Sequence, residues 1–300
     1  MELAAVNSNI LHRVGIAALL LLLGASMHVH AEAGHHAFWK VKGRNNTVYL
    51  LGSVHMLKPD DSTLSPEMLQ AYEHSKTLVM ELDLNDADGD ALLGSSLEMT
   101  MLPEGQSLED VLGGALYADL VTHAKPLGLE PELMDRFQPW FAALVLEQTA
   151  LAKSGFEAGA GVDEQFAQRA QADGKPIIAL ETVEEQLGFF AHLSEQQQRQ
   201  YLRATLKDLD TEASDAGVMV SAWQRGDSAE LERLLRRESA NNPELFRMLT
   251  TDRNRRWLPK IVAMLSEDQD YLVIVGALHL VGNDGLVALL KNQGFQVEQP

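Results

Sequence analysis

A ten-residue pattern occurs near both ends of this chain and limits the folds that it can adopt. Residues 48–57, VYLLGSVHML, match residues 272–281, LVIVGALHLV. Each copy is a short apolar run typical of a buried strand, followed by Gly-x-x-His and two apolar residues. We therefore expect two equivalent strands, each with a histidine, His55 or His279, just past its carboxyl end.

Two further apolar runs end in acidic residues, Glu81 and Glu181, and they also read as short buried strands. Gly52 and Gly276 each permit the sharp turn or close backbone approach that a strand end needs. Because open α/β sheets bind ligands at the carboxyl ends of their strands, the two glutamates and the two histidines are expected to converge there. A structural role for each histidine is the alternative, because one Gly-x-x-His motif is a weak signal.

The order of the expected elements indicates an α/β fold. Strands are expected near both ends of the chain, and a mainly helical segment is expected at about residues 104–265. This order predicts a central mixed or mostly parallel sheet, built from strands of both chain ends, with a large helical insertion. The expected strands cover residues 37–42, 47–51, 77–82, 176–181, 271–275 and 294–297.

The amino-terminal segment has the features of a secretory signal. Arg13 is followed by an uncharged apolar run at residues 14–27 and by a small-residue pattern at residues 29–31. The run is shorter than the roughly 20 residues of a membrane-spanning helix. We expect cleavage after Ala31, with an uncleaved anchor as the alternative, and a single domain over residues 32–300. The mature chain is then expected to be periplasmic or secreted, without a membrane span.

Composition narrows the chemistry that this chain can perform. It has 24 Lys and Arg residues against 43 Asp and Glu residues, a formal net charge of −19. Nucleic-acid binding depends on basic side chains that neutralise phosphates, so no nucleic-acid partner is expected. Cysteine is absent, which excludes disulfides, thiolate metal sites and thiol nucleophiles. The expected partner is a peptide or a small-molecule substrate, and the oligomeric state stays open.

The expected cluster contains two carboxylates, and their burial requires a compensating positive charge. A divalent cation would supply this charge. Imidazole and carboxylate ligands together suit Mn²⁺, Fe²⁺, Co²⁺ or Zn²⁺. The residues therefore favour a divalent metal at this edge of the sheet, and they leave its identity open.

These motifs resemble the TraB/GumN family, which is related to the Tiki metalloproteases and is marked by two Gly-x-x-His motifs near the ends of its domain. The similarity extends from about Ala37 to Val297. The resemblance implies an α/β domain with a helical insertion and, by analogy with Tiki proteins, a metal-dependent peptidase. It makes His55, Glu81 and His279 the leading metal-ligand candidates. Shorter matches lie at residues 78–83, 161–163, 180–182 and 253–254.

Further side chains have hypothetical roles in a hydrolytic reaction. Glu81 or Glu181 would act as the general base. Arg253 and Asn254 would stabilise the developing oxyanion, although Arg253 could instead pair with acids at the surface. Asp163 would orient a ligand histidine through its second ring nitrogen, with a helix cap or first-turn acid as the alternative.

Two classes of function remain open. The first is an exported metal-dependent hydrolase, peptidase-like, with a site of two histidines and a carboxylate. The second is a non-catalytic periplasmic protein on the same fold, which binds a small ligand or haem or docks a partner. The sequence contains neither His-Glu-x-x-His nor Gly-x-Ser-x-Gly, so a thermolysin-like zinc helix and a serine-hydrolase elbow are not indicated.

Overall fold

The computed structural model of this chain describes residues 36–83, 98–241 and 243–300. The predicted signal segment, residues 1–31, lies outside these ranges. None of the helices within them has the length and apolar character needed to cross a membrane.

The described residues form a six-stranded sheet with the strand order β4-β3-β5-β2-β1-β6. The pairs β2–β5, β5–β3 and β3–β4 are parallel, whereas β1 is antiparallel to both of its neighbours. This mixed, mostly parallel sheet with many helices confirms the predicted α/β fold. The strands are β1 (Phe38–Lys42), β2 (Thr47–Ser53), β3 (Thr77–Met80), β4 (Ile177–Ala179), β5 (Tyr271–Gly276) and β6 (Val297–Glu298).

The two strands that carry the repeated pattern, β2 and β5, are direct neighbours in the sheet. They are offset by one residue, because Ser53 rather than Gly52 is opposite Gly276. A side chain at Gly52 would lie 2.9 Å from the Cα atom of Ala277. Glycine is therefore needed at position 52, where the backbone just after β5 passes close to β2. The Gly52 carbonyl accepts a 2.7 Å hydrogen bond from Trp223 Nε1, which satisfies it inside the core.

The chain divides into two compact units. The described part of the helical unit covers residues 98–156 and 182–215. Its most buried helix, α6, packs against α5 and α9, which explains why apolar residues occur all around α6. The helices of this unit are α4 (Leu108–Leu112), α5 (Gly114–Leu127), α6 (Pro139–Lys153), α8 (Val183–Ala191) and α9 (Glu195–Asp208).

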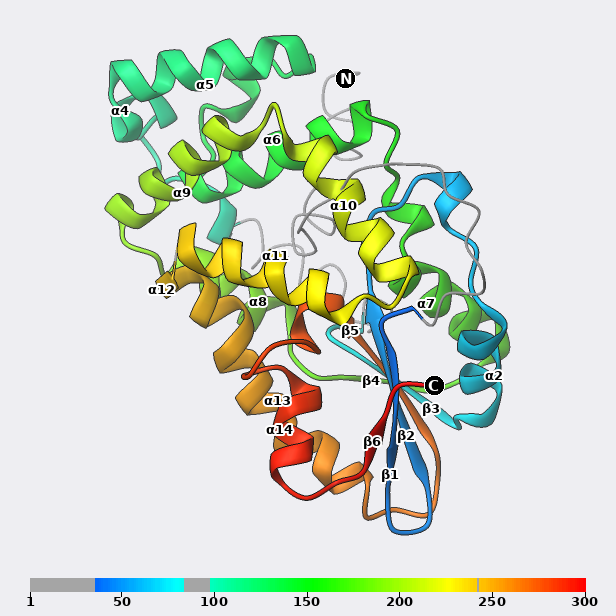
Figure 1. Cartoon of the computed structure of the whole chain (residues 1–300). Helices are drawn as coiled ribbons and strands as arrows, with labels where there is room; N and C mark the ends of the chain where they lie inside the picture. The colour runs from blue at the N-terminus through cyan, green and yellow to red at the C-terminus, as the bar shows by residue number, and fades with distance from the viewer. Residues whose placement is uncertain (1–35, 84–97, 242) are drawn as a thin grey trace. The chain divides into compact units, whose positions relative to one another are not determined.

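The sheet unit contains all six strands and, in its described part, residues 36–83, 157–181, 216–241 and 243–300. In Figure 1, α13 and α14 lie on one side of the strands, and α2 and α7 lie on the other. The single domain predicted for residues 32–300 stays a prediction. The helices here are α2 (Pro66–His74), α7 (Val162–Asp173), most of α10 (Glu212–Gln224), α11 (Ser228–Asn241), α12 (Pro243–Phe246), α13 (Asp252–Met264) and α14 (Leu286–Asn292).

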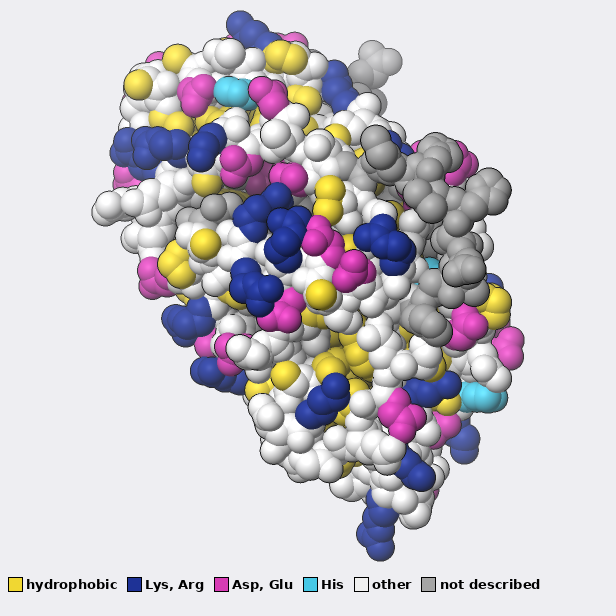
Figure 2. Space-filling view, in the orientation of Figure 1, with side chains coloured by type: hydrophobic (Ala, Val, Ile, Leu, Met, Phe, Trp, Pro, Cys, Tyr) yellow, Lys and Arg dark blue, Asp and Glu magenta, His cyan; other side chains and the backbone are white. Residues whose placement is uncertain are grey.

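Charged side chains of both signs are interspersed on the face of the molecule in Figure 2, and hydrophobic side chains are scattered among them. The net charge of −19 is therefore not gathered into a single acidic patch on that face. The charged side chains of Glu81, Glu181 and Arg253, by contrast, are buried beside the sheet edge.

Candidate functional site

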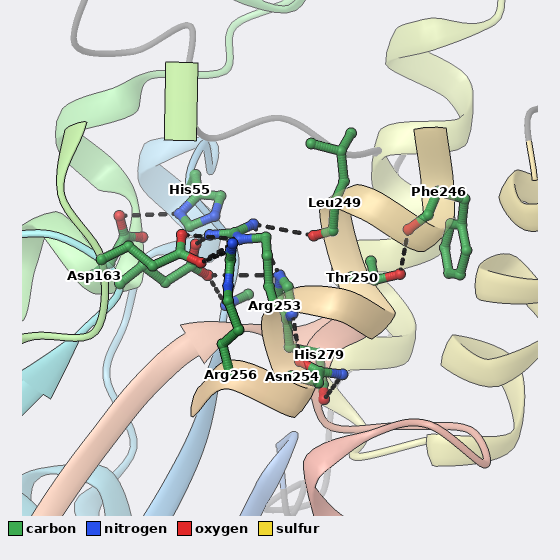
Figure 3. Close-up of polar contacts among 12 residues, drawn as sticks. His55, Asp163, Phe246, Leu249, Thr250, Arg253, Asn254, Arg256 and His279 are labelled. Carbon is green, nitrogen blue, oxygen red and sulfur yellow. Dashed lines mark hydrogen bonds and ion pairs between the residues drawn. The ribbon is translucent and has the colours of Figure 1, made fainter. Parts of the chain in front are cut away.

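The structure brings together the four side chains that were expected at one sheet edge. His55, Glu81, Glu181 and His279 follow β2, β3, β4 and β5, respectively, and these four strands run parallel. Arg253 on α13 reaches into the same cluster (Figure 3). All of these residues belong to the sheet unit.

His279 is held in one tautomer by Asn254. The Asn254 amide nitrogen donates to two backbone carbonyls, 3.1 Å to His279 and 2.9 Å to Asp284. This turns Asn254 Oδ1 toward His279 Nδ1, at 2.7 Å, so that Nδ1 carries the hydrogen and Nε2 has the lone pair. Burial and the neighbouring Arg253 charge lower the pKa of His279 to about 3, so the ring is neutral near pH 7.

His55 is positioned by Asp163 in a similar way. Its Nδ1 atom lies 3.0 Å from Asp163 Oδ2. Burial lowers the pKa of His55, but the Asp163 and Glu81 carboxylates together outweigh burial, and the net shift is upward. A side chain at Gly161 would collide with the His55 carbonyl, and the Val162 amide donates to the Val54 carbonyl at 3.1 Å. Residues 161–163, one of the short segments that resemble the family, therefore pack the start of α7 closely against the loop that carries His55.

Asp163 lies in the first helical turn, as one expectation has it, while its role in orienting a metal-ligand histidine stays a prediction. It lies in the first turn of α7, whose N-cap is Gly161, and an acid there is favourable for the helix dipole. It also contacts the ring nitrogen of His55 that faces away from the cluster. Histidines that ligate a metal through one ring nitrogen commonly have a carboxylate at the other ring nitrogen.

Glu81 is an ionised, buried carboxylate at the centre of the cluster. Its Oε1 atom accepts a 2.7 Å hydrogen bond from the Gly276 amide, and Oε2 accepts one from Arg253. Burial raises the pKa of Glu81. Arg253, the two histidines and the Gly276 amide have the larger combined effect in the opposite direction and lower the pKa to about 2. The net effect is a fixed negative charge that lies 4.0 Å from His279 Nε2.

The positive charge between the two glutamates comes from Arg253. Its Nε atom donates to both Glu181 oxygens, at 3.2 and 3.0 Å, and its Nη2 atom donates to Glu81. Nη1 lies 3.1 Å from the Leu249 carbonyl and 3.2 Å from His279 Nε2. A divalent cation was the predicted source of this compensating charge, whereas in the structure the Arg253 guanidinium pairs with both carboxylates.

Arg253 is only 7% exposed, so the alternative of a surface ion pair is wrong. Glu181 also accepts a 2.9 Å hydrogen bond from Arg256, and both of its oxygens are therefore engaged by arginines. The Asn254 amide hydrogens are directed to backbone carbonyls within a buried setting. The general-base role of Glu181 and the oxyanion role of Arg253 and Asn254 stay predictions.

Three contributors to the site were not anticipated from the sequence. Arg256 pairs with Glu181, and the Leu249 carbonyl lies in a π-helical turn, η4 (Arg247–Thr251), directly before α13. Trp257 is fully buried, and its ring lies 4.6 Å from the His279 ring and 4.6 Å from the Arg253 guanidinium carbon. The spacing of four residues between Arg253 and Trp257 places both on one helix face and was the available signal.

Gly276 lies against all three candidate metal ligands. A Cβ atom there would lie 3.5 Å from Glu81 Oε1, 3.5 Å from His279 Cδ2 and 3.6 Å from His55 Nε2. Two imidazoles and a carboxylate are suitable donors for a divalent cation. Among the described residues, however, no three His, Asp or Glu side chains are placed as a formed metal site. The donor types fit a cation, while Arg253 contacts two of the three donors.

The chain is similar to a bacterial protein and to animal metalloproteases along most of its length. YbaP from Escherichia coli K12 is 28% identical over 265 residues, which cover 87% of this chain and 96% of YbaP. The metalloprotease TIKI2 of Xenopus tropicalis is 26% identical over 312 residues, which cover 87% of this chain and 59% of TIKI2. Human metalloprotease TIKI1 is 26% identical over 320 residues, with 87% and 61% covered.

The chain thus spans about three fifths of the length of these two metalloproteases. No solved structure matches it significantly. The sequence profile of the TraB/PrgY/gumN family matches residues 37–299, a range that includes both Gly-x-x-His motifs and every residue of the cluster. This chain is a member of the TraB/PrgY/gumN family.

Proposed function

We propose that this protein is an exported, metal-dependent hydrolase that acts on peptides, with His55, Glu81 and His279 as metal-binding residues. The observation that carries the proposal is the shared direction of the two histidines. Each Nδ1 atom is held from behind, by Asp163 or by Asn254, and each ring faces Glu81 and Gly276. Distant relatives named metalloproteases support this class of reaction, and the apolar leader supports export.

The chain's own residues prepare the site for this chemistry. Asn254 fixes the tautomer of His279, the Asp163 carboxylate lies beside His55 Nδ1, and the low pKa of Glu81 keeps its carboxylate ionised. Arg253 and Arg256 hold Glu181 in place through ion pairs. A divalent cation at the three donors would supply a Lewis acid for the scissile carbonyl.

The Gly276→Ala variant tests the proposed site without removing any polar group. Its methyl group would make ordinary contacts with the three donors, so we expect the melting temperature to change by less than about 3 °C. The same methyl group fills the space between the donors, so divalent-cation affinity should fall by about 100-fold or more. Calorimetric titration with Zn²⁺ and Mn²⁺ measures the affinity, and a peptide library with and without chelator measures hydrolysis.

Gly159→Ala is the matched control, because a side chain at that glycine meets no atom within 4 Å. It should bind metal and cleave peptides as the wild type does. Equal metal affinity in Gly276→Ala and the wild type would contradict the proposed site. Peptide hydrolysis that survives complete removal of metal would contradict metal dependence.

The Asp163→Asn variant is expected to weaken metal binding by about 10- to 100-fold, because loss of the carboxylate lowers the basicity of His55 and loosens its ring. Calorimetric titration of the purified variant measures the change. Glu164→Gln removes a negative charge from the same helix turn without touching His55 and serves as the control. An equal loss in both variants would mean that only the general charge of α7 matters.

A further inference from the structure

Arg253 competes for the atoms that a cation would need. With the hydrogen of His279 on Nδ1, its Nε2 atom has one lone pair, and Arg253 Nη1 lies 3.2 Å from that atom. Arg253 Nη2 also donates to Glu81. A lone pair that accepts a hydrogen bond cannot at the same time coordinate a cation. At His279, the guanidinium and a metal ion are therefore mutually exclusive.

Electrostatics gives the same result. The cluster already balances the charges of Glu81 and Glu181 with Arg253 and the half-exposed Arg256. A divalent cation beside Glu81 and His279 would be repelled by a guanidinium in contact with the same two groups. Binding is therefore expected to require movement of the end of the Arg253 side chain.

The contacts of Arg253 show which partners its displacement would release. Its Nε atom, nearest the aliphatic stem, donates to both oxygens of Glu181 at 3.2 and 3.0 Å. Only the two terminal nitrogens contact His279 and Glu81. Because the guanidinium is planar and rigid, release of those two partners requires the side-chain torsions to swing the whole group, which also shifts its contact with Glu181.

We propose that Arg253 is an internal cation that holds the site in a metal-free form and is displaced from Glu81 and His279 when a divalent cation binds. This inference rests on the proposed function, because it uses the same three ligands. It adds an intramolecular competitor that sets the affinity of the site for metal.

Calorimetric titration of wild type, Arg253→Met and Arg256→Met with Zn²⁺ and Mn²⁺ tests the competition. Arg253→Met removes the guanidinium from Glu81 and His279 and should bind at least about tenfold more tightly than the wild type. Arg256→Met removes a guanidinium from Glu181 alone and should stay within about threefold of the wild type. Saturating metal should also raise the melting temperature of Arg253→Met more than that of the wild type.

A second variant covers the case in which Arg253→Met does not fold without metal. The single ammonium group of Arg253→Lys cannot contact Glu81, Glu181 and His279 together. The Arg253→Lys variant should therefore also bind metal more tightly than the wild type.

The outcomes separate the two proposals. Equal affinities in all variants, with metal bound in each, would overturn the competition and leave the proposed function intact. Weaker binding in Arg253→Met would show that Arg253 supports the ligands and would also overturn the competition. Absence of metal binding in every protein, wild type included, would overturn the proposed function and the inference together.

Discussion

The metal-free Arg253→Met variant is expected to lose about 3–5 kcal/mol of unfolding free energy relative to the wild type. The substitution keeps an apolar stem of similar length but removes the guanidinium that pairs with Glu81 and Glu181. Both glutamate side chains are nearly inaccessible to water, so their charges would remain buried with less compensation. Urea denaturation in the presence of chelator, followed by circular dichroism, measures the loss.

The double variant Glu81→Gln/Arg253→Met provides the control for this effect. It removes one of the two buried negative charges together with the arginine and should recover more than about 1 kcal/mol relative to additive losses. Recovery of this size would place the loss in the ion pair rather than in packing against Trp257. A loss below about 1 kcal/mol for Arg253→Met would contradict a stabilising role of the buried cation.

Acidification from pH 7.5 to 4 is expected to destabilise the wild type by about 3 kcal/mol more than the His279→Gln variant. Burial and the Arg253 charge hold the pKa of folded His279 at about 3, against 6.5 for the exposed side chain. As the pH falls below 6.5, the unfolded state takes up this proton and the folded state does not. Stability is therefore lost at about 1.4 kcal/mol per pH unit in the window from 6.5 to 3.

The other titrating groups of the cluster do not obscure this comparison. Glu81 has a folded pKa of about 2, so its stabilisation is lost only below about pH 4.5. The raised pKa of His55 acts with the opposite sign and above pH 6.5, and both proteins retain it. Urea denaturation at pH 7.5, 6, 5 and 4 measures the two profiles. Parallel profiles would show that His279 takes up its proton in the folded state.

The two effects explain why the site is buried and polar at once. A buried ion pair contributes little net stability compared with an apolar replacement of the same shape, but it is costly to break in half. Arg253 compensates the two buried carboxylates of Glu81 and Glu181, and its loss would leave them with less positive charge nearby.

Much of the site edge was predictable from the sequence because its signals are local. The apolar runs before His55, Glu81, Glu181 and His279 mark buried strands. Parallel strands place their carboxyl ends at one edge, whatever the length of chain between them. The same patterns predicted six strands and the α/β class, which the sheet order confirms, although β6 covers Val297–Glu298 rather than residues 294–297.

Other features depended on how helices pack against the sheet. The one-residue offset between the two copies of the repeat arises from the ladder between β2 and β5, and the pattern alone aligned glycine with glycine. The position of Trp257 against His279 depends on the packing of α13. The apolar pattern of α13 indicates which of its faces is buried, but not which part of the sheet that face packs against, so such contacts are absent from the sequence signal.

The sequence by itself determined which residue types reach the carboxyl edge of the sheet, since strand period and chain direction decide this locally. Only the tertiary structure decided what neutralises the two carboxylates. Arg253 is separated from Glu81 by 172 residues, and their contact exists because α13 packs beside that edge. A buried charge is compensated by whichever cation is nearest in space, and the sequence order does not record that distance.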